Sequence, residues 1–374
     1  MPAVHRRPVL RDDATVTTSL SLRALNRATL QRQMLLERAT TDAVTAVERL
    51  GGLQAQEPKP PFLALWTRLR DFDREQLHEP LRDGRIVRAT AMRATLHLMS
   101  AGDYAALRSA LQPVMSAAMA AVRGRDQGLD IAKLLPVASA LIEKSPRTFG
   151  ELRPLLVEAF PGVNDRALGY AVRMHLPLAM VPTEDRWSFP SDAKFKLAES
   201  PRGKADPRAL VRRHLGAFGP ASTADIQTWS GLRGIAEVLE QMSDELVTLQ
   251  HGRRTLFDLP GAPRPDEDVA APPRLLPEFD SLLLAYKDRS RVVADEHRRS
   301  LTTKNLRVKA AFLVDGFVAG SWTVARKRDT ATLALAPFAK LPRAAAGALE
   351  QEAESLLRFA EPDAAKHRVE VSAA

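Results

Sequence analysis

Apolar positions recur at helical spacing through the first hundred residues. Those between residues 27 and 38 predict one helix, and Asp42 is placed to cap a second. Shorter helices are expected at 62–69 and 74–82. The pattern then changes, and the segment 86–99 predicts two strands.

The same order, helices followed by a pair of strands, occurs twice more. The second copy has helices at 148–160 and 164–176 and strands near 179–181 and 187–189. The third copy has helices at 206–215, 222–229 and 234–242 and strands at 246–250 and 255–259. Helices followed by a two-stranded ribbon are typical of winged helices. Their repetition predicts three winged-helix motifs in tandem.

The last part of the chain differs in composition. Pro, Asp and Gly crowd into residues 260–273, which predicts a linker. Beyond it, Asp315-Gly316 predicts a hairpin turn. Strands are expected at 282–286, 308–315, 317–324, 330–335 and 367–371, with a helix at 341–359. These elements predict an α+β unit.

The expected fold class is therefore α+β, with tandem winged-helix motifs and a C-terminal β-rich domain. The expected division is an irregular N-terminal arm (1–20), a first winged helix (21–102), connecting helices (103–145), a second winged helix (146–200), a third winged helix (201–260), a linker (261–273) and a C-terminal domain (274–374).

The charge of the chain indicates what kind of partner it binds. The chain has 54 Lys and Arg against 45 Asp and Glu, a net charge of +9. This balance favours a polyanion, although arginine-rich faces in contact with solvent would give the same sum.

Composition also excludes several chemistries. The chain has no cysteine, so disulfides, thiolate metal sites and iron-sulfur clusters are ruled out. A phosphate-binding loop, a dinucleotide fingerprint, a paired-histidine zinc helix and a nucleophile elbow are missing from the sequence. We expect no cofactor and no metal. The longest apolar runs fall short of the roughly 20 residues of a membrane span, so we expect a cytoplasmic protein without membrane contact.

The segment 51–58 carries the most distinctive polar pair. Gln54 and Gln56 follow a predicted helix end at Gly51 and Gly52, and an extended segment would point both amides the same way. A pair of amides can hold a water molecule near a sugar carbon without carrying charge. The same amides can also simply cap the helix end and fix the following loop.

Basic residues gather at three further places. Arg88, Arg93 and His97 lie on the first predicted ribbon, where they could straddle a DNA backbone or serve as solvated and structural residues. The C-terminal domain holds a dense tract and a basic hairpin tip, for which we favour a polyanion over plain solvation. The tract includes Arg289, Arg291, Arg298 and Arg299, and the tip is Arg326-Lys327-Arg328.

Taken together, five stretches resemble the AlkZ-like DNA glycosylases, a bacterial family with winged-helix motifs. The stretches are residues 25–30 (LNRATL), 52–56 (GLQAQ), 93–98 (RATLHL), 276–280 (LPEFD) and the hairpin from 315–316 (DG) to 320–322 (GSW). The resemblance covers most of the chain, although residues 1–20 have no clear counterpart.

The resemblance implies a fold, a reaction and residue roles. It implies a C-shaped arrangement of the winged helices and catalysis by a Gln-x-Gln motif, which Gln54 and Gln56 match. It implies excision of N7-alkylated purines from double-stranded DNA and unhooking of interstrand crosslinks, with water as the nucleophile. His97 matches a family histidine associated with DNA backbone contact. The partner is then DNA with alkylated or crosslinked bases.

The family chemistry agrees with the residues. An N7-alkylated purine is cationic and leaves readily, so the enzyme needs to position water and stabilise an oxocarbenium-like sugar. Two other functions stay open: a non-catalytic transcription regulator or architectural DNA binder, and a module that binds RNA or another acidic partner. A regulator usually needs a dimerisation element, and no heptad repeat is apparent, so we expect a monomer.

Overall fold

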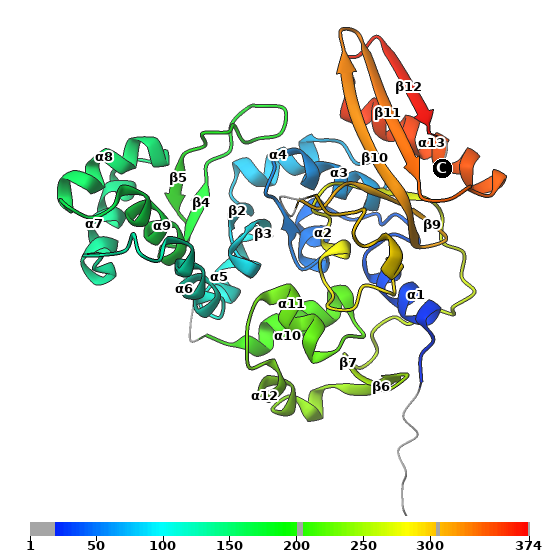
Figure 1. Ribbon diagram of the computed structural model, residues 1–374, viewed down its shortest axis with the longest axis horizontal. Helices are drawn as coiled ribbons and strands as arrows, with labels where there is room; N and C mark the ends of the chain where they lie inside the picture. Colours follow the sequence, from blue (N-terminus) through cyan, green and yellow to red (C-terminus); the bar gives the residue numbers. More distant parts are fainter. Residues whose placement is uncertain (1–18, 200–204, 304–306, 373–374) are drawn as a thin grey trace, which may run out of the picture.

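The computed structural model describes residues 19–199, 205–303 and 307–372, so the expected arm at 1–20 lies almost entirely outside the described residues. The first part of the chain is a set of helices around a short sheet (Figure 1). Its elements are α1 (Leu22–Arg32), α2 (Ala43–Arg49), β1 (Leu53–Gln54), α3 (Lys59–Arg68), α4 (Glu75–Arg82), β2 (Ile86–Thr90), η1 (Met92–Ala94) and β3 (Leu96–Ser100).

Local polar groups explain where these helices begin. Asp42 accepts a hydrogen bond from the Thr45 amide, as the sequence predicts, and starts α2. The expected helix at 27–38 is shifted, because α1 begins at Leu22 and ends at Arg32. Met34 then takes a positive φ of 55°. The leucines after it are buried in an irregular segment, so their spacing imitates a longer helix.

The second part is helical, with one further pair of strands. Its elements are α5 (Ala101–Leu107), α6 (Gln112–Ala118), η2 (Met119–Val122), α7 (Ile131–Lys144), α8 (Phe149–Ala159), α9 (Asp165–His175), β4 (Leu178–Met180) and β5 (Phe195–Leu197). Thr148 and Glu151 form a reciprocal capping box at α8. The strand expected at 187–189 is wrong, because these residues lie in a turn closed by the hydrogen bond from Thr183 N to Ser188 O.

The first two ribbons join into one sheet instead of standing apart as wings. The strand order is β1-β3-β2-β4-β5, and β2 meets β4 at the pair Ala89 and Ala179. The β2–β3 ribbon therefore has neighbours on both sides. Both edges of the ribbon are thus paired, and its contact with a DNA backbone stays a prediction.

The third part keeps the order that the sequence predicts. Its elements are α10 (Pro207–Phe218), α11 (Thr223–Ser230), α12 (Ile235–Glu240), η3 (Ser243–Glu245), β6 (Val247–His251) and β7 (Arg254–Asp258). Ser222 caps α11 through a capping box with Asp225. The β6–β7 ribbon forms a separate two-stranded sheet. The division of the chain into three winged-helix modules stays a prediction.

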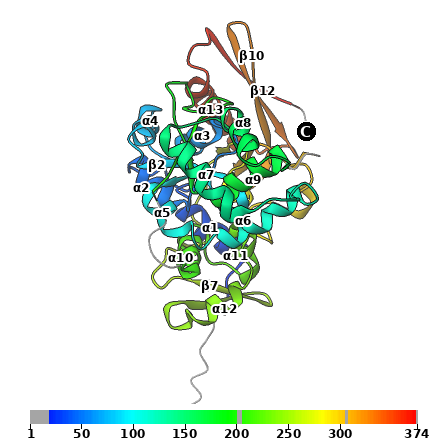
Figure 2. The ribbon, with the colours of Figure 1, turned by 90° about the vertical axis from the view of Figure 1, so that its left-hand side faces the viewer.

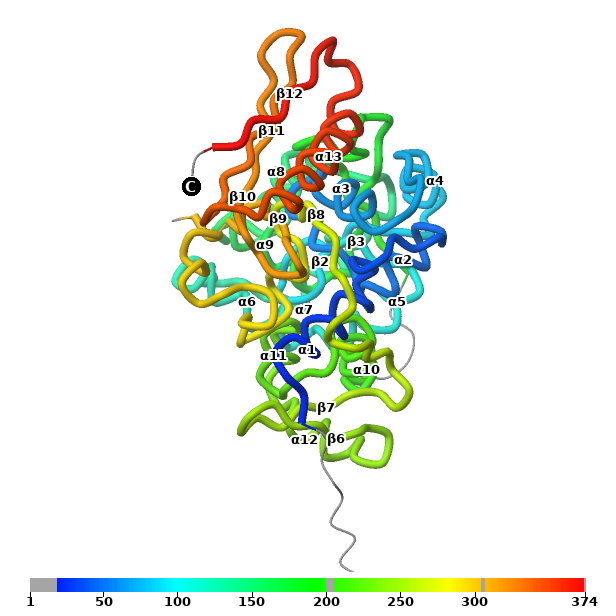
Figure 3. Tube along the Cα trace, turned by 90° about the vertical axis from the view of Figure 1, so that its right-hand side faces the viewer, coloured from blue at the N-terminus to red at the C-terminus, as the bar shows by residue number. Residues whose placement is uncertain are grey.

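The C-terminal part is a five-stranded sheet with one long helix. Its elements are β8 (Arg274–Leu276), η4 (Ser281–Leu283), η5 (Asp295–His297), β9 (Ala311–Val314), β10 (Phe317–Lys327), β11 (Thr330–Pro337), α13 (Arg343–Ala360) and β12 (Lys366–Val371). The strand order is β12-β11-β10-β9-β8, with β12 parallel to β11 and the other pairs antiparallel. Figure 3 shows α13 beside β8 and α3, where it covers one face of this sheet.

The strand expected at 282–286 is wrong. Those residues form η4 and a buried turn, and the Tyr286 hydroxyl donates to Phe218 O at 2.7 Å. The run is apolar because the core surrounds it, which is a pattern that a buried strand would share. Sequence reasoning also missed β8, which is only three residues long.

One core connects the parts. A single buried cluster contains Leu30 of α1, Met92 of the β2–β3 turn, Trp229 of α11 and Tyr286 beyond the linker. Figure 2 shows the β6–β7 ribbon and the long β10–β11 hairpin at opposite ends of the molecule. The loop that carries Gln54 and Gln56 packs into a second buried cluster, which contains Leu53, Ala55 and Leu98.

Candidate active site

Two glycines place the Gln54–Gln56 segment against the sheet. Gly51 and Gly52 have positive φ values of 67° and 87°, which let the chain turn from α2 into β1. A Cβ at Gly52 would lie 3.2 Å from Leu98 O, so the close approach also favours glycine. Gln54 then pairs with His97, and Ala55 N donates to Leu96 O at 2.7 Å. The segment is extended at Gln54, as expected.

Arg93 fixes the amide of Gln54. Its Nη2 donates to Gln54 Oε1 at 2.7 Å, and its Nη1 donates to Trp229 O. A guanidinium only donates, so the oxygen of the amide must face Arg93 and the Nε2 amino group points elsewhere. Gln54 is 9% exposed, whereas Gln56 is exposed and its Oε1 accepts a long bond of 3.4 Å from Leu96 N.

The backbone of the β2–β3 turn packs against the C-terminal end of α11. Arg93 and Ala94 both have positive φ values, 55° and 56°. Gly231, just after α11, has φ 82°, and a Cβ there would lie 3.3 Å from Arg93 Cα. The first and third parts of the chain therefore meet directly behind Gln54, a contact that the sequence does not show.

His97 is buried and neutral. Its side chain is 1% exposed, and its Nδ1 lies 3.0 Å from Thr95 O. A carbonyl accepts, so Nδ1 carries the proton and Nε2 carries the lone pair. Burial and, to a smaller extent, the charge of Arg93 together lower the pKa of His97 to about 3.

We expect the excision rate to change by less than about twofold between about pH 5 and pH 6.5, because His97 already stays neutral there. Burial lowers the pKa values of Arg88 and Arg93 only to about 10, so both stay charged. Single-turnover rates across this range test the expectation. An inflection near about pH 6.5 that disappears in His97→Gln would contradict it.

Folding must be followed in the same experiment. The pKa of His97 is lower in the folded protein than in the unfolded chain, so its contribution to stability is complete above about pH 6.5 and is lost as the pH falls towards the folded value of about 3. Circular dichroism at each pH separates this loss from a change in rate.

Arg88 holds the main chain of the motif. It is 3% exposed, its Nε donates to Ala55 O at 2.9 Å, and its Nη2 donates to Gln56 O at 3.2 Å. Its guanidinium lies 4.9 Å from the ring centre of Phe189. We expected a DNA contact or a solvated residue, and neither fits this burial. Arg88 positions Gln56 instead.

The arginines of the C-terminal basic tract lie in different environments. Arg291 is 4% exposed, donates to Pro220 O at 2.7 Å and stacks on Tyr286, so the expected DNA contact is wrong and the residue belongs to the core. Arg298 is partly exposed and pairs with Asp295 at 3.2 Å, and Arg299 is exposed. Arg289 is half-buried and close enough to Arg93 for its charge to lower the pKa of that residue.

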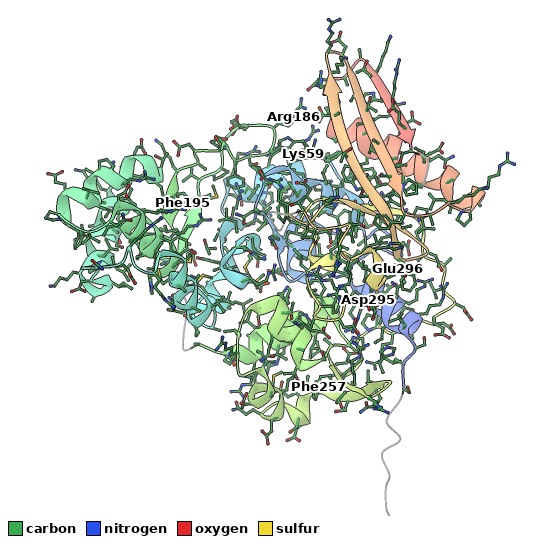
Figure 4. All side chains as sticks on the ribbon, in the orientation of Figure 1. Lys59, Arg186, Phe195, Phe257, Asp295 and Glu296 are labelled. Atoms are coloured by element: carbon green, nitrogen blue, oxygen red, sulfur yellow. The ribbon has the colours of Figure 1, made fainter. Side chains whose placement is uncertain are left out.

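The basic hairpin tip lies at the far end of β10 and β11. Arg326, Lys327 and Arg328 are exposed there, while Arg326 also donates to Asp363 O at 2.9 Å. Glu361 lies beside this tip: it is 3.6 Å from Arg326, pairs with Lys59 at 2.9 Å and lies 3.8 Å from Arg186. Figure 4 labels Lys59 and Arg186 near each other, where the β4–β5 loop meets the C-terminal part.

Sequence reasoning missed an ion-pair network next to the motif. Glu57, which follows Gln56, pairs with Arg307 at 3.1 Å, and Arg307 also pairs with Glu278 at 2.8 Å. Glu278 belongs to the LPEFD stretch. Asp280 of the same stretch makes two hydrogen bonds of 2.9 Å with the buried Arg68. The stretch thus ties the C-terminal part to the Gln54–Gln56 loop.

Within 19–199, 205–303 and 307–372, no three His, Asp or Glu side chains gather in a way that could hold a metal ion. Among the helices of these same residues, none is long and apolar enough to cross a membrane.

Known proteins are similar to this chain in fold and in sequence. A solved structure of the DNA glycosylase AlkZ of Streptomyces sahachiroi matches with a TM-score of 0.75 and 24% identity, over 95% of this chain and 100% of that chain. A curated relative from the same organism, an interstrand DNA cross-link repair glycosylase, is 27% identical over 358 residues, which are 88% of this chain and 94% of the relative.

The fold is thus the mixed α+β fold of a DNA glycosylase. The DNA glycosylase AlkZ-like family matches residues 47–359, which include the Gln54–Gln56 loop, the sheet behind it and most of the C-terminal part. The chain belongs to the AlkZ-like DNA glycosylase family.

Proposed function

We propose that this protein hydrolyses the N-glycosidic bond of N7-alkylated purines in double-stranded DNA and unhooks interstrand crosslinks made by such alkylation. The observation that carries the proposal is the pair of neutral amides of Gln54 and Gln56 at the edge of a buried sheet. Arg93 holds the amide of Gln54, and Arg88 holds the main chain of Ala55 and Gln56. The curated relative is named for interstrand crosslink repair, which supports the second half of the proposal.

Because the cationic purine is already a good leaving group, the protein contributes little to breaking the glycosidic bond. The bond between C1′ and N9 breaks, its electron pair neutralises the cationic purine, and a water oxygen bonds to C1′. Gln56 Oε1, only weakly held by Leu96 N, accepts a hydrogen bond from this water, and the amino group of Gln54 donates one to the water oxygen. Once the water oxygen has bonded to C1′, its extra proton leaves to solvent. The enzyme is monofunctional in this scheme, because water attacks and no lysine adduct forms.

DNA is held mainly through its phosphates. The net charge of +9, the partly exposed Arg298, the exposed Arg299 and the exposed hairpin tip favour contact with the backbone. We expect the protein to act as a monomer in the cytoplasm, at the nucleoid. Its role is repair of alkylated DNA or self-resistance to an alkylating agent.

Changing Arg326, Lys327 and Arg328 together to serine is expected to lower the slope of log affinity against log salt by about 2 to 3, because each lost phosphate contact removes close to one released counterion. The tip is exposed, so folding should not change. Fluorescence anisotropy with a labelled duplex at several salt concentrations measures the slope. An unchanged slope would remove the hairpin from the DNA interface.

The surroundings of the amides favour bulky, charged lesions. Phe62 is fully buried in the core, and Trp66 lies between Arg38 and Phe359, so the aromatic residues nearest the motif in sequence are committed to packing. Stacking of a flipped base in a fitted aromatic pocket then contributes little. We propose that the positive charge of the lesion and backbone contacts decide which base is removed.

A set of duplexes with one lesion each tests this function. We expect single-turnover excision of N7-methylguanine, of a bulky N7-alkylguanine and of an N7-linked crosslink, and much slower reaction with uracil, 8-oxoguanine or undamaged bases. Abasic sites revealed by alkali cleavage report the product. A preference for a small neutral lesion over every cationic one would overturn the proposal.

A further inference from the structure

Arg289 is a half-buried cation without an assigned partner. Its Nε is buried and donates no hydrogen bond to any described residue, and its guanidinium forms no ion pair in the described part of the chain. The nearest carboxylate in sequence, Asp288, is occupied by Arg254 and by the amide of Ser290 at 2.9 Å. The Arg289 carbonyl accepts from Val292 N and Val293 N, which fixes the backbone of this turn.

A second and a third guanidinium lie beside it. Arg289 and Arg93 are anchored to the same helix, α11. The amides of Lys287 and Asp288, just before Arg289, donate to Asp225 Oδ1 at 2.9 and 3.4 Å, and Arg93 Nη1 donates to Trp229 O one turn further along α11. The charge of Arg289 accordingly lowers the pKa of Arg93, and the charge of Arg298 lowers the pKa of Arg289. The one carboxylate paired with this group among the described residues is Asp295, which binds Arg298 and is 77% exposed. Figure 4 labels Asp295 on the loop that follows Arg289. Like charges gathered in a partly buried place are unfavourable unless an anion joins them.

Some N–H groups of Arg93 make no hydrogen bond within the described structure and are available to such an anion. Of its five N–H groups, one bonds to Gln54 Oε1 and one to Trp229 O in the described structure. The remaining donors and the fork of Arg289 suit a tetrahedral oxyanion, since guanidinium groups bind phosphate in a planar, two-pronged manner.

We propose that Arg93 and Arg289 form a clamp for the phosphodiester that flanks the target nucleotide, and that Arg93 couples this phosphate to the amide of Gln54. The proposal rests on the proposed function, because it takes DNA as the substrate. Each DNA strand carries a phosphate about every 3.4 Å along the axis, so the substrate strand supplies an anion on each side of the target nucleotide.

The clamp gives Arg93 a positioning role in the reaction. In the free protein its charge near Gln54 opposes a developing positive charge on the sugar. A bound phosphate neutralises the clamp while Arg93 keeps its hydrogen bond to Gln54 Oε1. The amide is then correctly oriented only when the DNA backbone is seated, which restricts chemistry to bound DNA.

Neutralising one phosphate at a time tests the clamp. In duplexes with a single N7-alkylguanine and one methylphosphonate, we expect one position beside the lesion to lower the wild-type excision rate by about tenfold or more, the loss of one charge-assisted contact. In Arg289→Met the same methylphosphonate should lower the rate by less than about twofold further, because the contact is already missing. Arg343→Met, an exposed arginine of α13, is the charge-matched control and should keep the full effect.

A binding measurement makes the result independent of catalysis. The double variant Gln54→Ala, Gln56→Ala should lose affinity at the same methylphosphonate position, and adding Arg289→Met should remove that loss. Arg93→Lys, which keeps the charge but not the fork, should retain affinity within about threefold and lower the excision rate by about tenfold.

The outcomes separate the clamp from the proposed function. Equal methylphosphonate effects in wild type and Arg289→Met would overturn the clamp, and so would the absence of any sensitive position. A wild-type protein that excises no alkylated base would overturn the proposed function, and the binding scan would still decide whether the clamp exists.

Discussion

Replacing Gln54 with alanine should lower the single-turnover excision rate by about 10²-fold or more, and Gln56→Ala should have an effect of similar size. Each substitution removes an amide that positions the attacking water. Folding and DNA affinity should stay nearly intact, because the backbone of the motif is held by Arg88 and by Ala55 N. The measurement is release of N7-methylguanine from a duplex, with enzyme in excess.

The control for this experiment is Gln76→Ala, which removes an exposed amide of α4. It should leave the excision rate unchanged, and circular dichroism and DNA binding should match wild type in all three variants. Wild-type rates in both Gln54→Ala and Gln56→Ala would show that the motif only fixes the loop, which is the other role that the sequence left open.

Replacing Asp280 with alanine should lower the free energy of unfolding by about 3 to 5 kcal/mol, because it leaves the charge of Arg68 buried without a partner. Both side chains of this pair are 1% exposed, and the pair has two hydrogen bonds of 2.9 Å. Asp280 also accepts from Leu282 N at 3.0 Å at the start of η4. Urea unfolding followed by tryptophan fluorescence measures the loss.

A matched exposed pair calibrates the measurement. Glu354 and Arg358 face solvent on α13, and Glu354→Ala should cost no more than about 0.5 kcal/mol. The double variant Arg68→Met, Asp280→Leu should recover part of the stability lost in Asp280→Ala, since no charge is then left unpaired. A loss below about 1 kcal/mol in Asp280→Ala would contradict a desolvated pair.

Helix starts could be predicted because their causes are local. Asp42, Thr148, Asn164 and Ser222 each accept a hydrogen bond from an amide three residues later, so the residue type and its position are sufficient. The hairpin turn at Asp315-Gly316 follows the same logic, with both residues at positive φ.

Sheet neighbours could not be predicted because their causes lie far apart in sequence. The pairing of Ala89 with Ala179 turns two expected wings into one sheet, and nothing near either alanine marks it. The apolar run at 282–286 is ambiguous for a related reason, because burial on all sides and pairing in a central strand require the same residues.

The candidate site likewise combines features that the sequence reveals with features that it does not reveal. Two amides after a broken helix were recognisable as a motif, whereas the roles of Arg88 and Arg93 were not. A long arginine side chain can turn inward as easily as outward, and its partners here are largely backbone carbonyls, which every sequence supplies. Arg289, which has no ion-pair partner among the described residues, is recognisable only when the C-terminal part is placed beside the β2–β3 turn.

The central claim is that this protein cleaves the bond between sugar and alkylated base by means of Gln54 and Gln56. The most direct measurement is mass spectrometry of the small molecules released from a duplex that contains N7-methylguanine, with wild-type protein and with the Gln54→Ala, Gln56→Ala double variant. We predict that wild type releases the intact free base and leaves an abasic site, and that the double variant, with the same DNA affinity, releases about 10²-fold less. Undiminished release by the double variant, or no free base from wild type, would contradict the account.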